Sequence, residues 1–440
     1  MNISSSNFSE AFVKHFQDWE QELNGQKQTA LHQIRQQAID LVAQNIIPTT
    51  KHEEWKYTNL NKIFKQDFVF DTENNNVAKE TIKNTALMHL DAYQIIILNG
   101  IFRPELSYLP NDKNIEISTL AEAHKKNNEL VEKYFSKVPE WENEVFTALN
   151  TAFAAKGLFV HAQKNATLEK PMLVQHITDS QQKNTIALPR NLFIFEQGSQ
   201  IDWIENYVTI GDNYSLVNGV NEIFVMPNAH ITHTKIQNEN EKAFQILTTQ
   251  VRQEKDSFYE NVTFSFKGGL IRNNLNIRLT GQNIEANMFG LYILNGKTHV
   301  DNHTIADHIA PNSVSNELYK GILDGQSTGV FNGKIFVRQD AQKTNAYQQN
   351  RNILLTDTAT VNTKPQLEIW ADDVKCSHGA TIGKLDQNAL FYLRARGITE
   401  KNAKALLVQA FGGEVIEKVT FEPLKEYLNA ILTEGLQINF

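Results

Sequence analysis

The chain has 440 residues, 41% hydrophobic and 21% charged, which is typical of an ordered protein large enough for more than one domain. Its 50 acidic and 42 basic side chains give a formal net charge of −8, which argues against a basic surface for nucleic acid. No apolar run is long enough to cross a bilayer, no signal-peptide pattern opens the chain, and one cysteine excludes an internal disulfide, so we expect a cytoplasmic location.

The N-terminal part of the chain is predicted to be mostly helical. Large apolar side chains recur at helical spacing in two stretches that end before Pro48. They are Phe8, Phe12, Phe16, Trp19 and Leu23 in the first stretch, and Leu31, Ile34, Ala38 and Leu41 in the second. We interpret both stretches as helix faces that pack in a core.

Three further elements are predicted before residue 158. An Asn-Gly turn between two apolar runs predicts a β-hairpin at residues 93–102. A capping box then predicts a single helix over residues 119–135. A last helix is expected at about residues 144–155, ended by a glycine.

From residue 158 onward, short alternating runs replace helical spacing for some two hundred residues. Turn residues at Gly198, Asn228, Asp256 and Gly281 recur at loose intervals of about 25–30 residues, in the range of solenoid coils. A sandwich or a barrel would fit the strand spacing equally well. The repeat favours a parallel β-helix, in which stacked coils bury a continuous core.

The β-rich region ends in a stretch that contains the only cysteine. Residues 367–374 alternate as a half-buried strand does, and we expect this strand to continue through Cys376 and His378. These two side chains would then point to one face. Gly379 and Gly383 are predicted to form a turn that ends the strand.

The C-terminal tail is predicted to be helical. Asp386 and Gly397 bound the first helix, residues 403–411 form one apolar stripe, Gly412-Gly413 is expected to break it, and Pro423 opens a final helix. These helices carry more apolar surface than they can bury by themselves. We therefore expect them to pack on the β body, on a partner, or on both.

Two groups of residues resemble binding motifs without matching them well. Gly296-Lys297-Thr298 lacks the earlier glycine and the following helix of a P-loop, so we reject ATP binding by this chain. Imidazole and carboxylate groups that suit zinc or iron are clustered in one run, and a polar ladder on a solvated β face explains them too. We prefer the ladder for this group, which comprises His299, Asp301, His303, Asp307 and His308.

Cys376 and His378 are the third candidate group. A stable iron–sulfur cluster usually takes four thiolates, and a nucleophilic cysteine needs an oriented base, so two residues are too few for either. The residues by themselves favour a structural turn. Because many β-helices act on polysaccharides, we keep such a protein as an alternative, although Asp372 and Asp373 are neighbours and make a poor carboxylate pair.

The segment LEIWADDVKCSHGATIGKLDQNALFYLRARGI at residues 367–398 closely resembles the signature of the SufB/SufD family of the SUF iron–sulfur cluster assembly machinery. The match is closest to the SufD branch of that family. HVDNHTIADHIAPN at 299–312 and GVFNGKIFVR at 329–338 are also similar, and WKYT at 55–58 resembles the N-terminal signature of the family. Read from its residues alone, the WKYT segment has no catalytic spacing and a structural role is favoured.

The resemblance implies a mainly β fold with three parts. These are an N-terminal mostly helical domain at 1–157, a right-handed parallel β-helix core at 158–385 and a C-terminal helical domain at 386–440. It implies a non-enzymatic scaffold subunit that joins SufB and the ATPase SufC, which docks on the C-terminal helices, and supports iron acquisition. In isolation a homodimer is expected to be possible.

The resemblance also implies what the site residues do. His378 would ligate iron at the SufB interface, where a nascent cluster is thought to form, and Cys376 would have a weaker role there. No cofactor is expected to bind this chain stably by itself, and an iron ion or iron–sulfur cluster would be bound transiently in the complex. Neither a membrane nor a nucleic acid is an expected partner.

Overall fold

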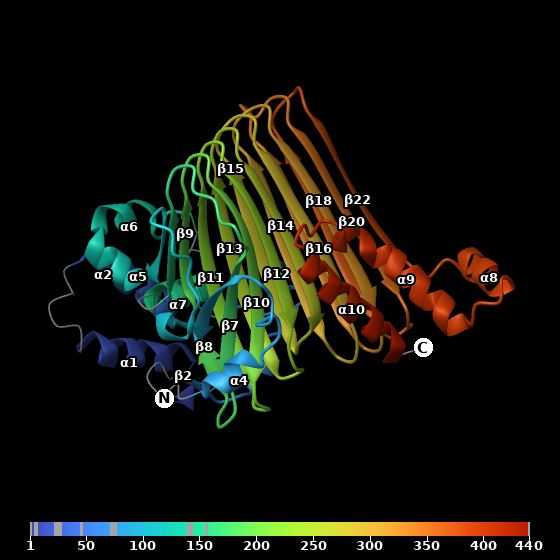
Figure 1. The fold of residues 1–440 in the computed structure, drawn as a ribbon, viewed down its shortest axis with the longest axis horizontal. Helices are drawn as coiled ribbons and strands as arrows, with labels where there is room; N and C mark the ends of the chain where they lie inside the picture. The colour runs from blue at the N-terminus through green and yellow to red at the C-terminus, as the bar shows by residue number, and fades with distance from the viewer. Residues whose placement is uncertain are drawn as a thin grey trace.

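Figure 1 shows the computed structural model of the chain as a long stack of strands with helices at both ends. The structure describes residues 2–3, 8–21, 29–44, 47–70, 77–138, 144–154 and 157–438. No helix within these ranges is long and apolar enough to span a membrane.

Two large sheets form the body, and in the described residues they contain 12 strands (sheet A) and 10 strands (sheet B). Sheet A consists of β1 (Asn2–Ile3), β2 (Phe68–Phe70), β5 (Ile115–Thr119), β6 (Leu158–Ala162), β8 (Thr185–Ala187), β9 (Arg190–Phe195), β11 (Ser215–Val225), β13 (Ala243–Gln253), β15 (Leu270–Leu279), β17 (His299–His308), β19 (Thr328–Val337) and β21 (Thr360–Ile369). Sheet B consists of β3 (Tyr93–Leu98), β4 (Ile101–Phe102), β7 (Met172–Asp179), β10 (Gln200–Ile210), β12 (His230–Asn238), β14 (Phe258–Lys267), β16 (Glu285–Leu294), β18 (Val314–Leu323), β20 (Asn345–Leu354) and β22 (Lys375–Gly383).

The long strands alternate between the two sheets, and each pairs in parallel with the strand one coil away. From β10 to β22, paired residues in sheet B lie 27 to 31 residues apart in the chain. Because a sandwich or barrel of this size would not show such a constant parallel offset, the predicted parallel β-helix is confirmed. Its first coils are extended by β2 and β3 from the N-terminal part, and the proposed domain boundaries stay a prediction.

The predicted turn residues hold the coils in register. Gly198, Asn228 and Asp256 each have φ between 59° and 73°, the left-handed conformation that glycine, asparagine and aspartate adopt most readily. The amide of Asn228 donates to the Lys255 carbonyl, and Asp256 donates in the same way to the next turn. Stacked turns therefore satisfy their backbone groups with one another.

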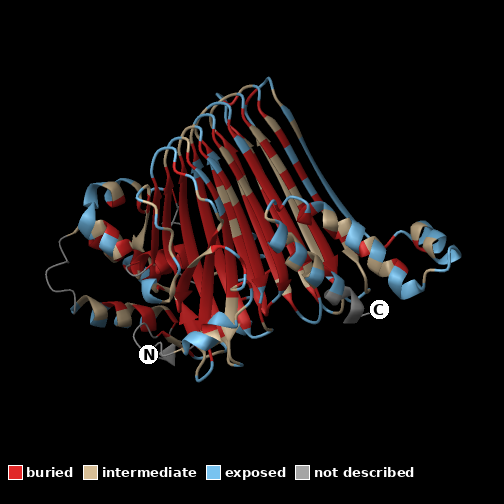
Figure 2. Ribbon diagram, in the orientation of Figure 1, coloured by how far each residue is buried: buried red, intermediate tan, exposed pale blue. Residues whose placement is uncertain are grey.

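The space between the sheets is the main core, and Figure 2 shows the strands of the middle coils as almost continuously buried. Apolar side chains such as Trp203, Ile231 and Val300 fill much of it. Polar groups are buried there as well. The carboxylate of Glu205, for example, lies 3.0 Å from His176 and 3.1 Å from His233, and these contacts compensate its burial.

Helices cover the outer face of sheet A at the N-terminal end of the stack (Figure 1). They are α1 (Phe8–Gln21), α2 (Ala30–Gln44), α3 (Asn61–Phe64), α5 (Leu120–Lys126), α6 (Asn128–Tyr134) and α7 (Val145–Ala152), with a 3-10 turn at Glu53–Trp55. Helix α4 (Lys79–Lys83) and the 3-10 turn at Pro104–Leu106 lie instead on sheet B, beside β3 and β7. Phe12, Phe16 and Ala38 are buried, as the helical stripes predict, while Leu23 lies outside the described residues.

The smaller N-terminal predictions had mixed outcomes. The hairpin is confirmed by the antiparallel pairing of β3 and β4, and the capping box of Thr119 and Glu122 is present. The single helix expected over residues 119–135 is wrong. Asn127 has non-helical backbone dihedrals and its side chain caps α6, so two short helices replace one. The helix expected at 144–155 is α7, and residues 155–156 lie outside the described residues.

Three helices follow the last strand: α8 (Gln387–Ala395), α9 (Glu400–Ile416) and α10 (Glu422–Ile438). The break expected at Gly412-Gly413 is wrong, because α9 runs through both glycines. A Cβ at Gly412 would lie 3.4 Å from side-chain atoms of Leu291 and Leu432. Gly412 therefore lies at ordinary packing distance from sheet B and α10, and it does not end the helix.

The strand expected to continue from residue 367 to Cys376 is also wrong. Strand β21 ends at Ile369, residues 370–374 turn the chain from one sheet to the other, and β22 then begins at Lys375. Gly379 lies inside β22, and Gly383 is its last residue. Side chains alternate between inward and outward positions in the strands of both sheets. This alternation therefore does not show at which residue the chain turns from one sheet to the other.

Candidate functional site

Strand β22 forms the open end of sheet B and carries both Cys376 and His378 (Figure 1). In the described part of the chain it pairs only with β20, and most of its residues are exposed (Figure 2). The strand therefore presents one row of backbone donors and acceptors that another chain can pair with.

Cys376 lies on the inner face of β22. Its register partner is Ala346, which is fully buried, and its side chain packs against the core between the sheets. Partial burial raises the pKa of the thiol. At neutral pH the sulfur is therefore held as a thiol, which is a weaker nucleophile and metal ligand than a thiolate.

His378 lies two residues further along, so it shares the inner face with Cys376, as the sequence predicted. It is exposed because no coil follows β22 in sheet B. In the preceding coil its register partner is the buried Gln348, and in the coil before that the buried Glu317 occupies the same position.

Cys376 and His378 do not make a complete metal site. The described ranges contain no group of three or more His, Cys, Asp or Glu side chains arranged to hold a metal ion. An imidazole and a thiol suit iron, and they provide at most two ligands. Any iron or cluster at this end would need further ligands from another chain.

A second exposed feature is α8, which projects from the end of the stack (Figure 1). Phe391 is 75% exposed and Tyr392 is 55% exposed. By contrast, α9 and α10 pack their apolar faces on the outer side of sheet B through residues such as Val408 and Leu428. Lys320 of β18 secures this packing, because its buried ammonium group contacts Glu414 and the Phe411 carbonyl of α9.

The polar run on β17 contains no group of three or more side chains arranged to hold a metal ion in the described structure, and it is not the solvated ladder that we preferred. Asp301 accepts from the Thr58 hydroxyl at 2.5 Å and pairs with Arg272 at 2.7 Å, while His299 contacts Thr58 at 2.9 Å. His303 lies 3.0 Å from Asp301. Residues 53–58 cover this face, so most of these groups are buried.

The two remaining members of that group lie on opposite faces of β17. Asp307 points outward and binds the Arg338 guanidinium at 2.7 Å, whereas His308 points inward and contacts Ser315 at 2.8 Å. Burial lowers the pKa of His308 to about 4. Strand alternation separates the two residues, so they cannot act as ligands of one ion.

Glu54 and the adjoining WKYT segment supply the partners of these polar groups. The Trp55 ring lies under the Arg272 guanidinium at 4.2 Å, and Glu54 binds Lys334 at 2.6 Å. Hydrogen bonding to His303 and Lys334 lowers the pKa of Glu54 to about 2, so this carboxylate stays ionised. The segment therefore has the structural role that the sequence favoured, and it holds coils that lie more than two hundred residues away.

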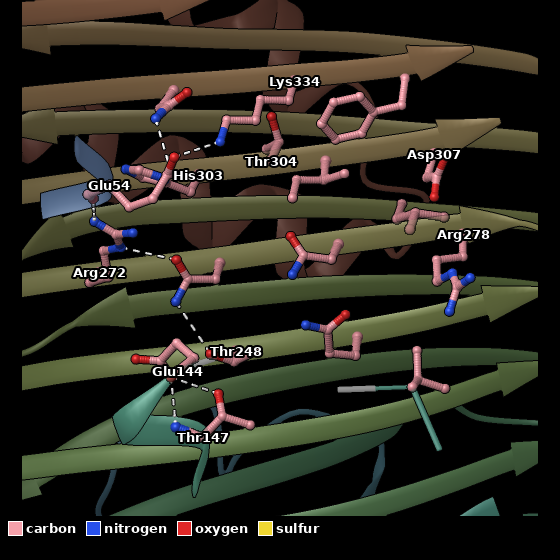
Figure 3. Close-up of a pocket in the computed structure, with 18 of the residues that line it drawn as sticks. Glu54, Glu144, Thr147, Thr248, Arg272, Arg278, His303, Thr304, Asp307 and Lys334 are labelled. Atoms are coloured by element: carbon pink, nitrogen blue, oxygen red, sulfur yellow. Dashed lines mark hydrogen bonds and ion pairs between the residues drawn. The ribbon is translucent and has the colours of Figure 1, made fainter. Parts of the chain in front are cut away.

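Beside the WKYT segment, the outer face of sheet A contains a cavity of about 730 Å³ (Figure 3). Figure 3 shows Glu54, His303 and Lys334 together at one end of it, and Asp307 near Arg278 at the other. Nothing in the sequence pointed to this cavity, because its walls come from elements that meet only in the folded chain.

The other sequence candidates take positions that do not support catalysis. Gly296-Lys297-Thr298 forms the turn from β16 to β17 and leads into a strand. Asp372 and Asp373 were expected to belong to a strand and instead lie in the turn before β22. No paired-carboxylate geometry supports the polysaccharide alternative at this place.

Comparison with known proteins identifies the family. The model described as SUF system FeS cluster assembly, SufBD core domain, matches residues 176–411. The model described as SufBD protein N-terminal region matches residues 6–174. The resemblance seen in the motifs is thereby confirmed over nearly the whole chain.

Full-length relatives agree with the family models. An iron–sulfur cluster assembly SufBD family protein of Synechocystis is 33% identical over 92% of this chain and 90% of its own length. The iron–sulfur cluster assembly protein SufD of Escherichia coli is 30% identical over 91% and 92%, and the chloroplastic protein ABCI7 of Arabidopsis thaliana is 29% identical over 94% and 89%. The chain therefore belongs to the SufB/SufD family of the SUF iron–sulfur cluster assembly system.

Proposed function

We propose that the chain is a non-catalytic scaffold subunit that joins a SufB subunit and the SufC ATPase during cluster assembly. The observation that carries the proposal is the open end of sheet B, where His378 is exposed on an edge strand without a complete ligand set in the described residues. A SufB solenoid end would pair with β22 and supply the missing ligands.

In this arrangement the iron ion or nascent cluster is cargo held between two subunits. The neutral imidazole of His378 donates a nitrogen lone pair to iron or passes a proton, while thiolates and carboxylates come from SufB. Cys376 contributes less, because its thiol packs against the core and its pKa is raised.

Cluster formation in a co-expressed complex tests this role. His378→Ala should leave the complex and its ATPase activity intact, since one side chain is a small part of an interface, and should strongly lower cluster formation measured by absorption spectroscopy. Cys376→Ala should have a milder effect, and His230→Ala, at another exposed histidine of sheet B, should have none. Full cluster assembly by the His378→Ala complex would contradict the proposal.

SufC is proposed to dock on the C-terminal helices, mainly through α8. The support is the exposure of Phe391 and Tyr392 on a helix that projects beyond the stack, while α9 and α10 are already packed on sheet B. Phe391→Glu should abolish co-purification of SufC without changing the melting temperature. Tyr108→Glu is the matched control, because this ring is 58% exposed far from α8. Unchanged SufC binding by Phe391→Glu would refute the docking site.

A further inference from the structure

We propose that Gln348 and Glu317 form a positioning pair that fixes the ring orientation and tautomer of His378. The inference deepens the proposed function, and it rests on that function only for the use made of the His378 ring. Neither residue needs to touch the cargo. Their effect would be to decide which imidazole nitrogen presents its lone pair at the open end of the stack.

The three residues form one row across neighbouring strands, on the inner face of sheet B. Glu317, Gln348 and His378 occupy the same register on β18, β20 and β22, and neighbouring parallel strands lie about 4.8 Å apart. Glu317 is 4% exposed and Gln348 is 1% exposed. Residues in register on one sheet share a face, so Gln348 is directly behind His378.

Hydrogen bonds set which way the Gln348 amide faces. Its Nε2 donates to Oε2 of Glu317 at 2.7 Å, and the hydroxyl of Thr304 donates to the other carboxylate oxygen. An ionised carboxylate only accepts hydrogen bonds, so the NH₂ end of Gln348 must turn toward Glu317. The carbonyl end, Oε1, is thereby turned away from that carboxylate.

The hydrogen bonding of this carbonyl oxygen is incomplete. Oε1 of Gln348 is buried and has no hydrogen-bond partner within the described ranges. Leaving a buried acceptor unpaired costs about 1–3 kcal/mol, so native proteins normally give it a donor. The donor-bearing side chain at the same register on the next strand is His378.

An N–H of the His378 ring that donates to Oε1 would explain both observations. The hydrogen bond would hold the ring and its tautomer, and the other nitrogen would keep a free lone pair directed away from Gln348. Histidines that bind metals commonly have their second nitrogen fixed in this way by a neighbouring acceptor. The pair would therefore prepare His378 as a ligand before a partner arrives.

A small residue on the opposite sheet makes room for this arrangement. A Cβ at Gly333 of β19 would overlap the amide nitrogen of Gln348 and the ring of Phe331. The Gly333 backbone has no positive φ that would require glycine, so packing space accounts for its identity. The inner wall is shaped to hold Gln348 in the position that reaches Glu317.

Long-range ¹H–¹⁵N NMR spectra of the isolated full chain test the pair directly, because the two imidazole nitrogens report the tautomer. The His378 signals are assigned by their loss in His378→Ala. Spectra are recorded at about pH 8.5, above the pKa of Glu317, which burial raises to about 7. Wild type should show one protonated and one unprotonated ring nitrogen, as expected for a single tautomer.

Two variants distinguish a role of Gln348 and Glu317 in orienting the His378 ring from a role in packing alone. Gln348→Met keeps the length of the side chain and removes the amide, so both ring nitrogens should shift toward a common averaged value. Glu317→Gln keeps Gln348 but removes the acceptor-only carboxylate, so both amide orientations become available and the same averaging is expected. Gln349→Met, on the exposed face of β20, should leave the His378 signals unchanged.

The outcomes are decisive in either direction. Averaged His378 signals in wild type, or a single tautomer retained in a folded Gln348→Met protein, would overturn the inference. If Gln348→Met does not fold, the Glu317→Gln spectra decide. Because the isolated chain is used, these results are independent of cluster assembly, and normal assembly by the His378→Ala complex would overturn only the proposed function.

Discussion

Replacing Glu317 by glutamine should change how the stability of the fold depends on pH. Its carboxyl group is buried, with hydrogen bonds from Thr304 and Gln348 and no ion pair within the described part of the chain. Burial raises its pKa from 4.5 to about 7. Below pH 4.5 the group is protonated in both the folded and the unfolded chain, so it contributes no pH dependence there.

Between pH 4.5 and 7 the unfolded chain releases this proton and the folded chain retains it, so the stability of the fold decreases as pH rises. A shift of this size corresponds to about 3 kcal/mol, and the loss is complete above pH 7. Glu317→Gln cannot ionise and lacks this loss, but it weakens a buried hydrogen-bond arrangement by about 1 kcal/mol.

The variant should therefore be less stable than wild type by about 1 kcal/mol near pH 4.5 and more stable by about 2 kcal/mol near pH 8.5. Urea unfolding followed by circular dichroism at both pH values measures the difference. Glu169→Gln, at an exposed position, is the control and should show no such reversal. A difference between Glu317→Gln and wild type that does not depend on pH would refute the reasoning.

Three further substitutions test the packing. Gly290→Ala should destabilise the fold by about 1–3 kcal/mol, because its Cβ would overlap the Tyr319 ring. Gly413→Ala should stabilise it by about 0.5–1 kcal/mol, because no atom lies within 4 Å of that Cβ in helix α9. Calorimetry measures both, and shifts of the same sign would contradict the packing argument. Thr58→Val should cost about 1–3 kcal/mol in urea unfolding, because Asp301 loses a buried donor, and an unchanged midpoint would contradict this.

The parts of the fold that depend on neighbours in sequence were predictable from the sequence. Turn residues such as Asn228 and Asp256 adopt left-handed dihedrals for local steric reasons, and they recur once per coil. Alternation within one strand correctly placed Cys376 and His378 on the same face. The apolar stripes of the terminal helices follow from a period of 3.6 residues, whatever they pack against.

Contacts between distant residues were decided only by the tertiary structure. Glycine is a poor helix former, yet α9 runs through Gly412, where it packs against Leu291 of sheet B and Leu432 of α10. Asp301 is buried because residues 53–58 cover it from the other end of the chain.

The row of Glu317, Gln348 and His378 across three strands also depends on contacts between distant residues. Its members are about thirty residues apart in the chain, and only the register of the coils brings them together. Local patterns specify the conformation of a segment and the face that each side chain takes. They do not specify which other segment that face meets, since the register is set by the length of every intervening turn and by the packing of the whole stack.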